Sequence, residues 1–280
     1  MKADLHLHTT ASDGKLSPRE IVRRASGMGL GVIAITDHDT VNGVGPALEE
    51  AAKFPQLKVI PGVEISTDIP EGEAHILGYF VDYLDPEFNH ALEELRDSRY
   101  ERGRRIVARL ADLGIEIDWE RVLQFAAGGT VGRPHIAQAL LEREYVPTVR
   151  DAFTKYIGRN GVAYVERKKL TPVEAVGAIV KAGGLPVLAH PADIEPLEPL
   201  VVRLKKAGMV GIETYYANYS ANKIAALETL ARKHQLIASG GSDYHGIDIT
   251  IGSEMGSVDL PQECVEKLVS MAERRRMVSP

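Results

Sequence analysis

Short apolar runs of the kind that form buried strands alternate along the chain with longer segments of helical periodicity. Such runs occur at residues 3–7, 31–36, 57–65 and 74–81 and again at 185–189, 210–214 and 236–239, with a further short run at 255–258. Helical segments separate most of these runs, residues 45–53 among them. Strands that alternate with helices predict an α/β protein built from parallel βα units.

Two of the predicted helices carry explicit start signals. The segments Ser17-Pro18-Arg19-Glu20 and Thr171-Pro172-Val173-Glu174 have the pattern of a capping box, with proline at the first helical position. Gly29 and the pair Gly183-Gly184 are placed to end these helices. Because about seven strands stand out clearly, one fewer than in an eight-stranded barrel, we expect an open or distorted barrel.

The βα alternation is interrupted in the middle of the chain. Residues 85–113 have the pattern of one long helix ending at Gly114, and shorter helices are expected at residues 118–125, 133–142 and 148–157. We therefore divide the chain into a barrel formed by residues 1–84 and 165–280 and a helical insertion, residues 85–164. The insertion leaves directly after the strand that bears His75, so we expect it to cover the mouth of the barrel.

Polar clusters at the ends of the predicted strands hold the candidate chemistry. Six of the nine histidines lie in short clusters, most of them with carboxylates, and read Asp4-Leu5-His6-Leu7-His8, Thr36-Asp37-His38-Asp39, Glu73-Ala74-His75, Ala189-His190-Pro191 and Ser242-Asp243-Tyr244-His245. Glu64 ends a further strand. Alternation puts His6 and His8 on one face of a strand, roughly 7 Å apart, and Asp243 and His245 have the same spacing.

Imidazoles combined with carboxylates form the ligand set of Zn, Mn or Fe. A single His-x-His pair, a lone His75 or a lone His190 is more often a structural histidine, and Asp37 and Asp39 are also typical of a turn. The recurrence of such clusters at one strand end after another favours metal binding, and convergent clusters indicate more than one ion. The sequence therefore predicts a multinuclear metal hydrolase. His90 and His234 lie in polar helical segments and are interpreted as surface residues.

Composition narrows the classes of partner. The 280 residues, 44% of them hydrophobic, are enough for one large domain with an insertion, and the net charge of −6 argues against a general electrostatic grip on long duplex nucleic acid. A small phosphorylated ligand remains compatible with that charge. The single cysteine, Cys264, fits a reducing compartment, and no apolar stretch reaches the ~20 residues of a membrane span. With no signal-peptide pattern near Asp4, we expect a cytoplasmic protein without membrane partners.

Two groups of basic residues in the insertion are candidate anion ligands. Arg99 and Arg102 fall near the apolar face of the long helix, where arginine stems on a solvated helix are the favoured interpretation and a grip on an anion over the metals is the alternative. In Gly132-Arg133-Pro134-His135, proline begins a helix, so Arg133 and His135 lie beside free backbone N–H groups at its positive end. That arrangement favours phosphate binding by Arg133 and His135.

The motifs DLHLHTTASDG, TDHDT, PGVEIS, HILGY, LAHP and GGSDYHG resemble, in order, those of the PHP (polymerase and histidinol phosphatase) family, over residues 1 to 80 and 165 to 256. The insertion with GRPHIA resembles the branch acting on nucleotides, which includes 3',5'-bisphosphate nucleotidases and 5'-to-3' exonucleases on short RNA. The resemblance implies a distorted (β/α)7 barrel and a site with three divalent ions (Mn, Fe or Zn).

The resemblance also implies a ligand set for each ion. The first ion would be held by His6, His8, Glu64 and Asp243, the second by a bridging Glu64 with His75 and His190, and the third by Asp13, His38 and His245. Many relatives have histidine in place of Asp13, and the harder carboxylate favours manganese or iron over zinc at the third position. Asp37 and Asp39 flank a ligand and are expected to accept hydrogen bonds from the ligands. Gly240 and Gly241 fit a tight turn.

The implied activity is hydrolysis of a phosphate ester by a metal-activated water. The leaving alcohol would receive its proton from a metal-bound water or from His190. The favoured substrate is a small nucleotide such as a 3',5'-bisphosphate. The alternatives are a 5'-3' exonuclease on short oligonucleotides, a histidinol phosphatase, and a metal- and phosphate-binding module without turnover. The complete ligand set argues against that last alternative.

Overall fold

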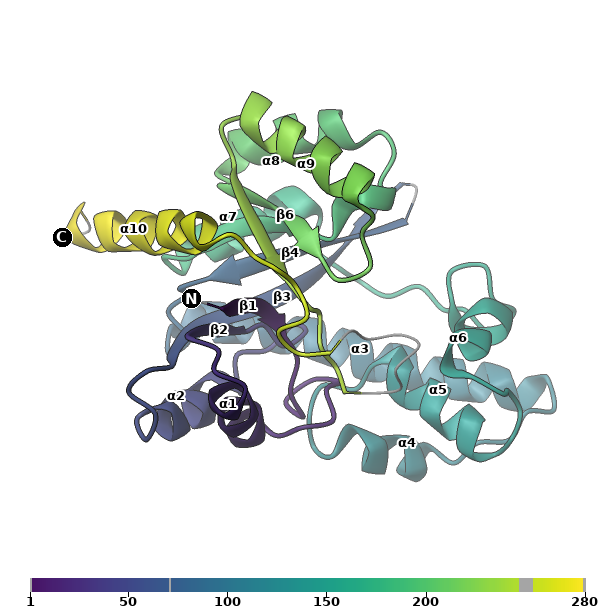
Figure 1. Ribbon diagram of the computed structural model, residues 1–280. Helices are drawn as coiled ribbons and strands as arrows, with labels where there is room; N and C mark the ends of the chain where they lie inside the picture. Colours follow the sequence, from purple (N-terminus) through teal and green to yellow (C-terminus); the bar gives the residue numbers. More distant parts are fainter. Residues whose placement is uncertain (1, 71, 247–253, 279–280) are drawn as a thin grey trace.

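The computed structural model describes residues 2–70, 72–246 and 254–278 and forms a distorted α/β barrel (Figure 1). Its sheet has seven strands in sequential order, which are β1 (Ala3–Leu7), β2 (Val32–Ile35), β3 (Lys58–Ile69), β4 (Gly72–Tyr79), β5 (Leu185–Ala189), β6 (Gly211–Tyr216) and β7 (Ile237–Gly241). The expected strand at residues 255–258 is wrong, because this segment contains a turn in which Gly256 has a φ of +69°.

The sheet is parallel except at β4, which runs antiparallel to both β3 and β5. The expectation of purely parallel βα units is therefore wrong at this strand. The cause is local, since no helix separates β3 from β4 and Ile69 at the end of β3 pairs with Gly72 at the start of β4. The reversal has a useful result. It brings the first residues of β4, Glu73 and His75, to the rim where the parallel strands end.

Strands β1 and β7 nearly close the barrel. The His8 N–H donates to the Tyr244 carbonyl over 3.0 Å, and the Asp4 carboxylate accepts from the backbone N–H groups of Ser242 (2.9 Å) and Gly256 (2.8 Å). Gly241 lies in β7, not in the turn that the sequence suggested, and a Cβ there would lie 2.4 Å from the Cβ of His6. Glycine at this position thus permits the two strands to approach closely.

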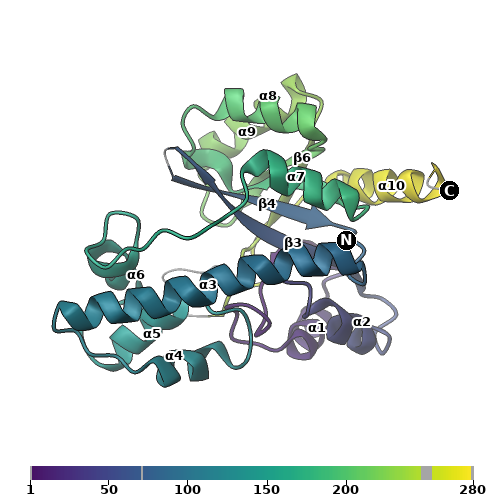
Figure 2. The same ribbon diagram turned by 180° about the vertical axis from the view of Figure 1, so that it is seen from behind.

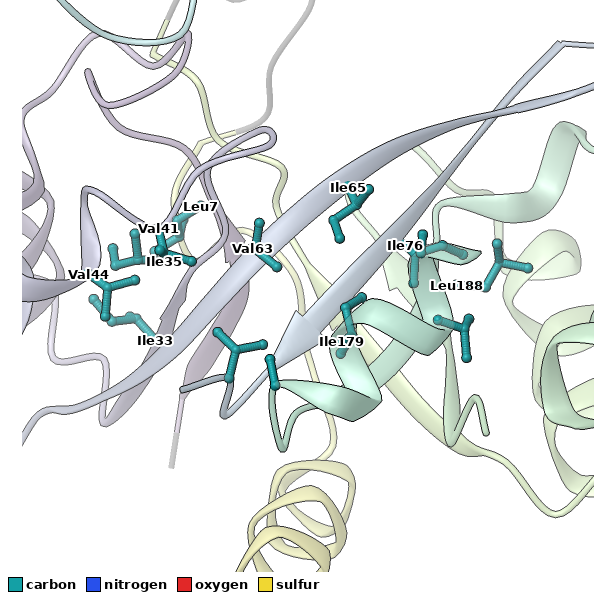
Figure 3. Close-up of a cluster of buried hydrophobic side chains, with 14 of the residues drawn as sticks. Leu7, Ile33, Ile35, Val41, Val44, Val63, Ile65, Ile76, Ile179 and Leu188 are labelled. Atoms are coloured by element: carbon teal, nitrogen blue, oxygen red, sulfur yellow. The ribbon is translucent and has the colours of Figure 1, made fainter. Parts of the chain in front are cut away.

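Helices on the outside cover the barrel. They are α1 (Pro18–Gly27), α2 (Val44–Ala51), α7 (Pro172–Lys181), α8 (Leu197–Ala207), α9 (Ala221–Lys233) and α10 (Gln262–Val278), with a 3-10 turn at Pro191–Asp193. Both predicted capping boxes are confirmed, at Ser17 and at Thr171. The core between helices and sheet includes Ile33, Ile65 and Ile76 from adjacent strands (Figure 3).

The middle of the chain forms helices α3 (Pro86–Asp112), α4 (Trp119–Ala126), α5 (Arg133–Glu142) and α6 (Val149–Ala152), followed by a π-helical turn at Phe153–Ile157. These helices lie to one side of the barrel, with α3 running along its length (Figures 1 and 2). Residues between 106 and 165 form their own hydrophobic cluster, centred on side chains such as Ile106, Ile136 and Leu140. The segment therefore packs around a separate core.

Candidate metal centre

A first cluster of ligand atoms forms where β1 ends. His6 and His8 point to the same side of β1, are fully buried, and have ring centroids 5.1 Å apart. Their Nε2 atoms lie 3.2 and 3.1 Å from Oε2 of Glu64 and 3.3 and 3.1 Å from Oδ1 of Asp243. The structure thus brings these four side chains together. Asp243 lies just beyond the end of β7 and has a φ of +55°, so the alternation of side chains along a strand does not determine its position.

Glu64 is the hub of the site. Its Oε1 lies 2.8 Å from Nδ1 of His75 and 3.1 Å from Nε2 of His190, while Oε2 is also 3.2 Å from Nδ1 of His38. Burial raises the pKa of Glu64, but the imidazoles of His38, His6 and His75 more than offset it and hold the pKa well below its usual range. Glu64 is therefore an ionised carboxylate with both oxygens directed at imidazoles.

A further cluster surrounds Asp13. Its Oδ1 lies 3.4 Å from Nε2 of His245 and 3.7 Å from Nδ1 of His8, and its Oδ2 lies 4.0 Å from Nε2 of His38. The rings of His8 and His245 stack at 4.0 Å. His8 thus contributes one ring nitrogen to each of two clusters, which the sequence did not indicate. His38 likewise groups with Glu64 and His75 as well as with Asp13.

The donor atoms of these clusters fit divalent ions. Within each of three groups, one potential ligand atom per residue lies within 4.8 Å of the others. In the part of the chain that the structure describes, several of these buried atoms have no hydrogen-bond partner, namely Nε2 of His6, both ring nitrogens of His8, Oδ1 of Asp13, Nδ1 of His38 and Oε2 of Glu64. Buried polar atoms are normally paired, and convergent imidazoles and carboxylates without partners are what bound cations would satisfy.

Two residues that the sequence analysis missed hold the ligands in place. Glu213, fully buried in β6, lies 3.0 Å from Nδ1 of His6 and accepts the backbone N–H of His190 over 2.7 Å. The Tyr216 hydroxyl donates to Oδ2 of Asp243 over 2.9 Å. A carboxylate on the far nitrogen of an imidazole fixes its orientation. The sequence did contain a signal for Glu213, because it is the single acidic residue within the apolar run at 210–214.

The aspartates that flank His38 have different partners. Asp37 accepts from the Thr9 backbone N–H (2.7 Å) and the Ser12 hydroxyl (2.6 Å), which holds the loop leading to Asp13. Asp39 accepts from Nε of Arg99 over 2.6 Å and from a terminal nitrogen of Arg167 over 3.0 Å. Both aspartates are thus hydrogen-bond acceptors next to the ligands, but their donors are not the ligand histidines. They anchor the segments around the site.

Cationic side chains line a pocket of about 170 Å³ together with residues of the metal-ligand clusters. Arg133 donates to both oxygens of Glu73, over 3.1 and 2.9 Å, and Lys169 donates to Glu73 over 2.6 Å and to Asp68 over 2.7 Å. The metal-ligand residues that line the pocket are Asp13, His38, His75 and His245, and the other charged lining residues are Glu73, Arg99, Arg102, Arg133, Arg167 and Lys169. Arg167 and Lys169 were not foreseen, because nothing but a short charged run marks them.

Of the predicted residues of the insertion, Arg99, Arg102 and Arg133 line this pocket, whereas His135 is not one of its lining residues. Arg99 and Arg102 are buried, so the favoured interpretation of stems on a solvated helix is wrong; β3, β4 and the segment around Arg167 cover them. His135 is buried and its Nδ1 accepts the Gly132 backbone N–H over 3.0 Å, so its proton is on Nε2.

The two histidines interpreted as surface residues differ. His90 is 74% exposed. His234 is only 15% exposed and its Nε2 lies 2.6 Å from Glu198, so the surface interpretation is wrong for that residue.

The barrel and its rim of imidazoles and carboxylates define a class of protein, the metal-dependent hydrolases of phosphate esters. The family model described as the PHP domain matches residues 4–156, more than half of the chain, and the chain belongs to the PHP family.

Two curated relatives match most of the chain. The 5'-3' exoribonuclease Rnm of Salmonella typhimurium is 41% identical over 247 residues, which cover 86% of this chain and 84% of that protein. The 3',5'-nucleoside bisphosphate phosphatase of Chromobacterium violaceum is 32% identical over 267 residues, 93% of each protein.

Solved structures agree with the fold. An amidohydrolase from Chromobacterium violaceum, with bound sulfate and no metal, has a TM-score of 0.88 at 31% identity, over 98% of this chain and 97% of the other. A candidate metal-dependent phosphoesterase from Bifidobacterium adolescentis has the same TM-score at 29% identity, over 96% and 95%. No helix among the described residues is long and apolar enough to span a membrane.

Proposed function

We propose that the protein hydrolyses a phosphate ester of a small nucleotide, with a 3',5'-bisphosphonucleotide as the favoured substrate class. The observation that carries the proposal is the pocket of about 170 Å³, which is lined both by metal-ligand residues and by arginine and lysine side chains. A phosphate group at that place could contact both bound ions and these side chains. Relatives named as a bisphosphate phosphatase and as an exoribonuclease support a nucleotide substrate.

We propose three divalent ions (Mn, Fe or Zn) as the cofactor, with manganese or iron favoured over zinc at the third position. His6, His8, Glu64 and Asp243 would hold the first, Glu64 with His75 and His190 the second, and Asp13, His38 and His245 the third, with His8 and His38 able to serve two ions each. When bound, such ions lower the pKa of a water molecule and polarise the phosphate oxygens. His190 is more exposed than the other ligands, which supports a second role as proton donor to the leaving alcohol.

Arg133 and His135 are the proposed anchors of the substrate, with Arg99 and Arg102 behind them. Arg133 lies at the start of α5 and holds its guanidinium against Glu73, near the rings of Phe153 and Tyr164. A substrate phosphate would take the place of the Glu73 carboxylate on Arg133. Arg99 is already bound to Asp39 and Ser66, so its proposed part is to shape the wall and not to contact the substrate.

The pocket volume supports a limited contact with the substrate. Pockets that enclose a whole small-molecule ligand are usually ~300–1,000 Å³. A space of about 170 Å³ accommodates a phosphate-bearing end and leaves the nucleobase outside. The same feature favours the second candidate function, a 5'-3' exonuclease on short oligonucleotides, since the rest of an oligonucleotide could extend away from the pocket. Long duplex nucleic acid is not a proposed partner.

We propose different roles for different parts of the chain. Residues 1–84 and 165–280 would form the metal-binding barrel, and the insertion, residues 85–164, would supply Arg99, Arg102 and Arg133 to the pocket beside the metal ligands. The proposed compartment is the cytoplasm, with which the buried free thiol of Cys264 is compatible.

A direct test is an activity screen of the manganese-loaded protein against adenosine 3',5'-bisphosphate, short 5'-phosphorylated oligonucleotides and histidinol phosphate. We expect turnover of the bisphosphate, with release of inorganic phosphate. Release of mononucleotides from the oligonucleotides at a higher kcat/KM would favour the exonuclease. Turnover of histidinol phosphate alone would refute a nucleotide substrate.

A further inference from the structure

Arg102 is a buried cation with no anionic partner among the described residues. Its side chain is 3% exposed and lines the pocket between the metal ligands and the insertion. No carboxylate of the described chain lies within 4.0 Å of its guanidinium, in contrast to Arg99, Arg133 and Arg167, each of which has one. Arginines are rarely buried without a paired anion, so this one indicates a missing ligand.

The carboxylates near Arg102 are already engaged. Asp39 forms ion pairs with Arg99 and Arg167, and Glu73 forms ion pairs with Arg133 and Lys169. Glu73 is the carboxylate that attracts Arg102, and it does so from beyond ion-pair distance. Among the described residues, the four cations Arg99, Arg133, Arg167 and Lys169 are therefore paired with three carboxylates, those of Asp39, Glu73 and Asp68, and Arg102 adds a fifth positive charge.

Electrostatics at Arg102 lead to the same conclusion. Burial, followed by repulsion from Arg133, Arg99 and Arg167, lowers the pKa of Arg102 well below its usual range. An anion bound in the pocket would attract the Arg102 guanidinium, which now experiences net repulsion from the neighbouring arginines. In addition, Nε of the neighbouring Arg167 is a buried donor without an acceptor. A ligand with several acceptor oxygens and a double negative charge meets both needs.

We propose that Arg102 forms a subsite for a second phosphate of the substrate, one that is bound and not hydrolysed. The inference rests on the proposed function and adds a requirement to it. The reacting phosphate is held by the metal-ligand residues, and the second phosphate binds Arg102 of α3, which lines the same pocket. Substrates with two phosphates are then favoured over those with one, whatever base they carry.

The test compares adenosine 3',5'-bisphosphate with adenosine 3'- and 5'-monophosphate for the manganese-loaded wild type and Arg102→Met. We expect kcat/KM for the bisphosphate to fall about 10- to 100-fold, the scale of a charge-assisted hydrogen bond, while the better monophosphate changes by less than about threefold. Calorimetric titration of the bisphosphate into metal-free protein should show a loss of affinity of similar size. Arg105→Met, an exposed arginine on the same helix, is the matched control.

Stability supplies a second readout. Methionine removes a buried charge without leaving a partner behind, so Arg102→Met should melt no earlier than the wild type in the absence of ligand. An equal loss on bisphosphate and monophosphates, or an unchanged preference, would overturn the second subsite and leave Arg102 a structural residue. Failure of the wild type to hydrolyse any of these nucleotides would instead refute the proposed function itself.

Discussion

Replacement of Asp39 by asparagine should destabilise the protein far more than its small change in shape suggests. The Asp39 carboxylate is fully buried and binds both Arg99, from α3, and Arg167, from the segment that returns to the barrel. The two arginines hold the pKa of Asp39 at about 2, despite burial, which raises it. Asparagine keeps an acceptor for the Ser66 backbone N–H but turns an NH₂ group toward a guanidinium.

The magnitude follows from what remains after the charge is lost. Breaking a buried ion pair by removing one partner costs about 3–5 kcal/mol, because the other charge is left without compensation. Arg99 keeps its hydrogen bond to the Ser66 hydroxyl (2.7 Å) and Arg167 keeps weaker ones to carbonyls of Leu95 and Lys168. We therefore expect the lower part of that range, about 3 kcal/mol.

Urea unfolding of the metal-free protein measures this loss. With an m-value of about 3 kcal/mol per molar, the midpoint should fall by about 1 M. The only tryptophan, Trp119, lies in α4 of the insertion. Its fluorescence should change at least as early as the circular dichroism signal, because Asp39 joins α3 of the insertion to the barrel through Arg99.

The matched control is Asp37→Asn. Asp37 is equally buried, but its partners are the neutral donors of Thr9 and Ser12, and burial raises its pKa. A neutral amide removes that cost of ionisation, so the loss should stay below about 1.5 kcal/mol. Equal effects of the two substitutions, or a loss below about 1 kcal/mol for Asp39→Asn, would contradict the reasoning.

Three further predictions concern the site itself. Glu64→Gln should reduce kcat by at least about 10³-fold without unfolding the protein, which circular dichroism would check. Near-normal turnover would show that Glu64 is not a central metal ligand, and His90→Ala is the control. Elemental analysis after manganese saturation should find about three ions per chain, and chelation should lower the melting temperature, whereas one ion at most would exclude a trinuclear site. Arg133→Ala should cost about 2–3 kcal/mol in kcat/KM on a nucleotide and less on p-nitrophenyl phosphate; an equal loss on both would mark a structural residue.

Residues whose positions follow from the alternation of side chains along a strand could be predicted from the sequence. His6 and His8 share a face of β1 because the period of a strand is fixed locally, and the start of α5 at Arg133 followed from Pro134. The antiparallel course of β4 had a signal in Pro70 and Gly72, which mark a turn between two strands with no helix between them.

Other features depend on packing that a local pattern does not contain. A helix over solvent and a helix over the rim of a barrel have the same periodicity, so the burial of Arg99 and Arg102 could not be read from α3 alone. The contact of Arg99 and Arg167 with one aspartate joins positions far apart in the chain, and neither residue has a sequence signature. Glu73 lay two residues before His75 on the same strand face, yet its role depends on Arg133 and Lys169 opposite it.

The seam at Asp4 has a consequence for how the chain folds. Its carboxylate joins β1 to Ser242, a partner 238 residues later in the sequence, so one of the contacts that complete the barrel is also among the longest-range. During synthesis from the amino terminus, β1 must wait with an unpaired edge until β7 has emerged. Loop closure over such a distance slows folding. A circular permutant that links the two ends and opens the chain elsewhere would bring Asp4 and Ser242 much closer together in the sequence, and it should fold faster into the same barrel.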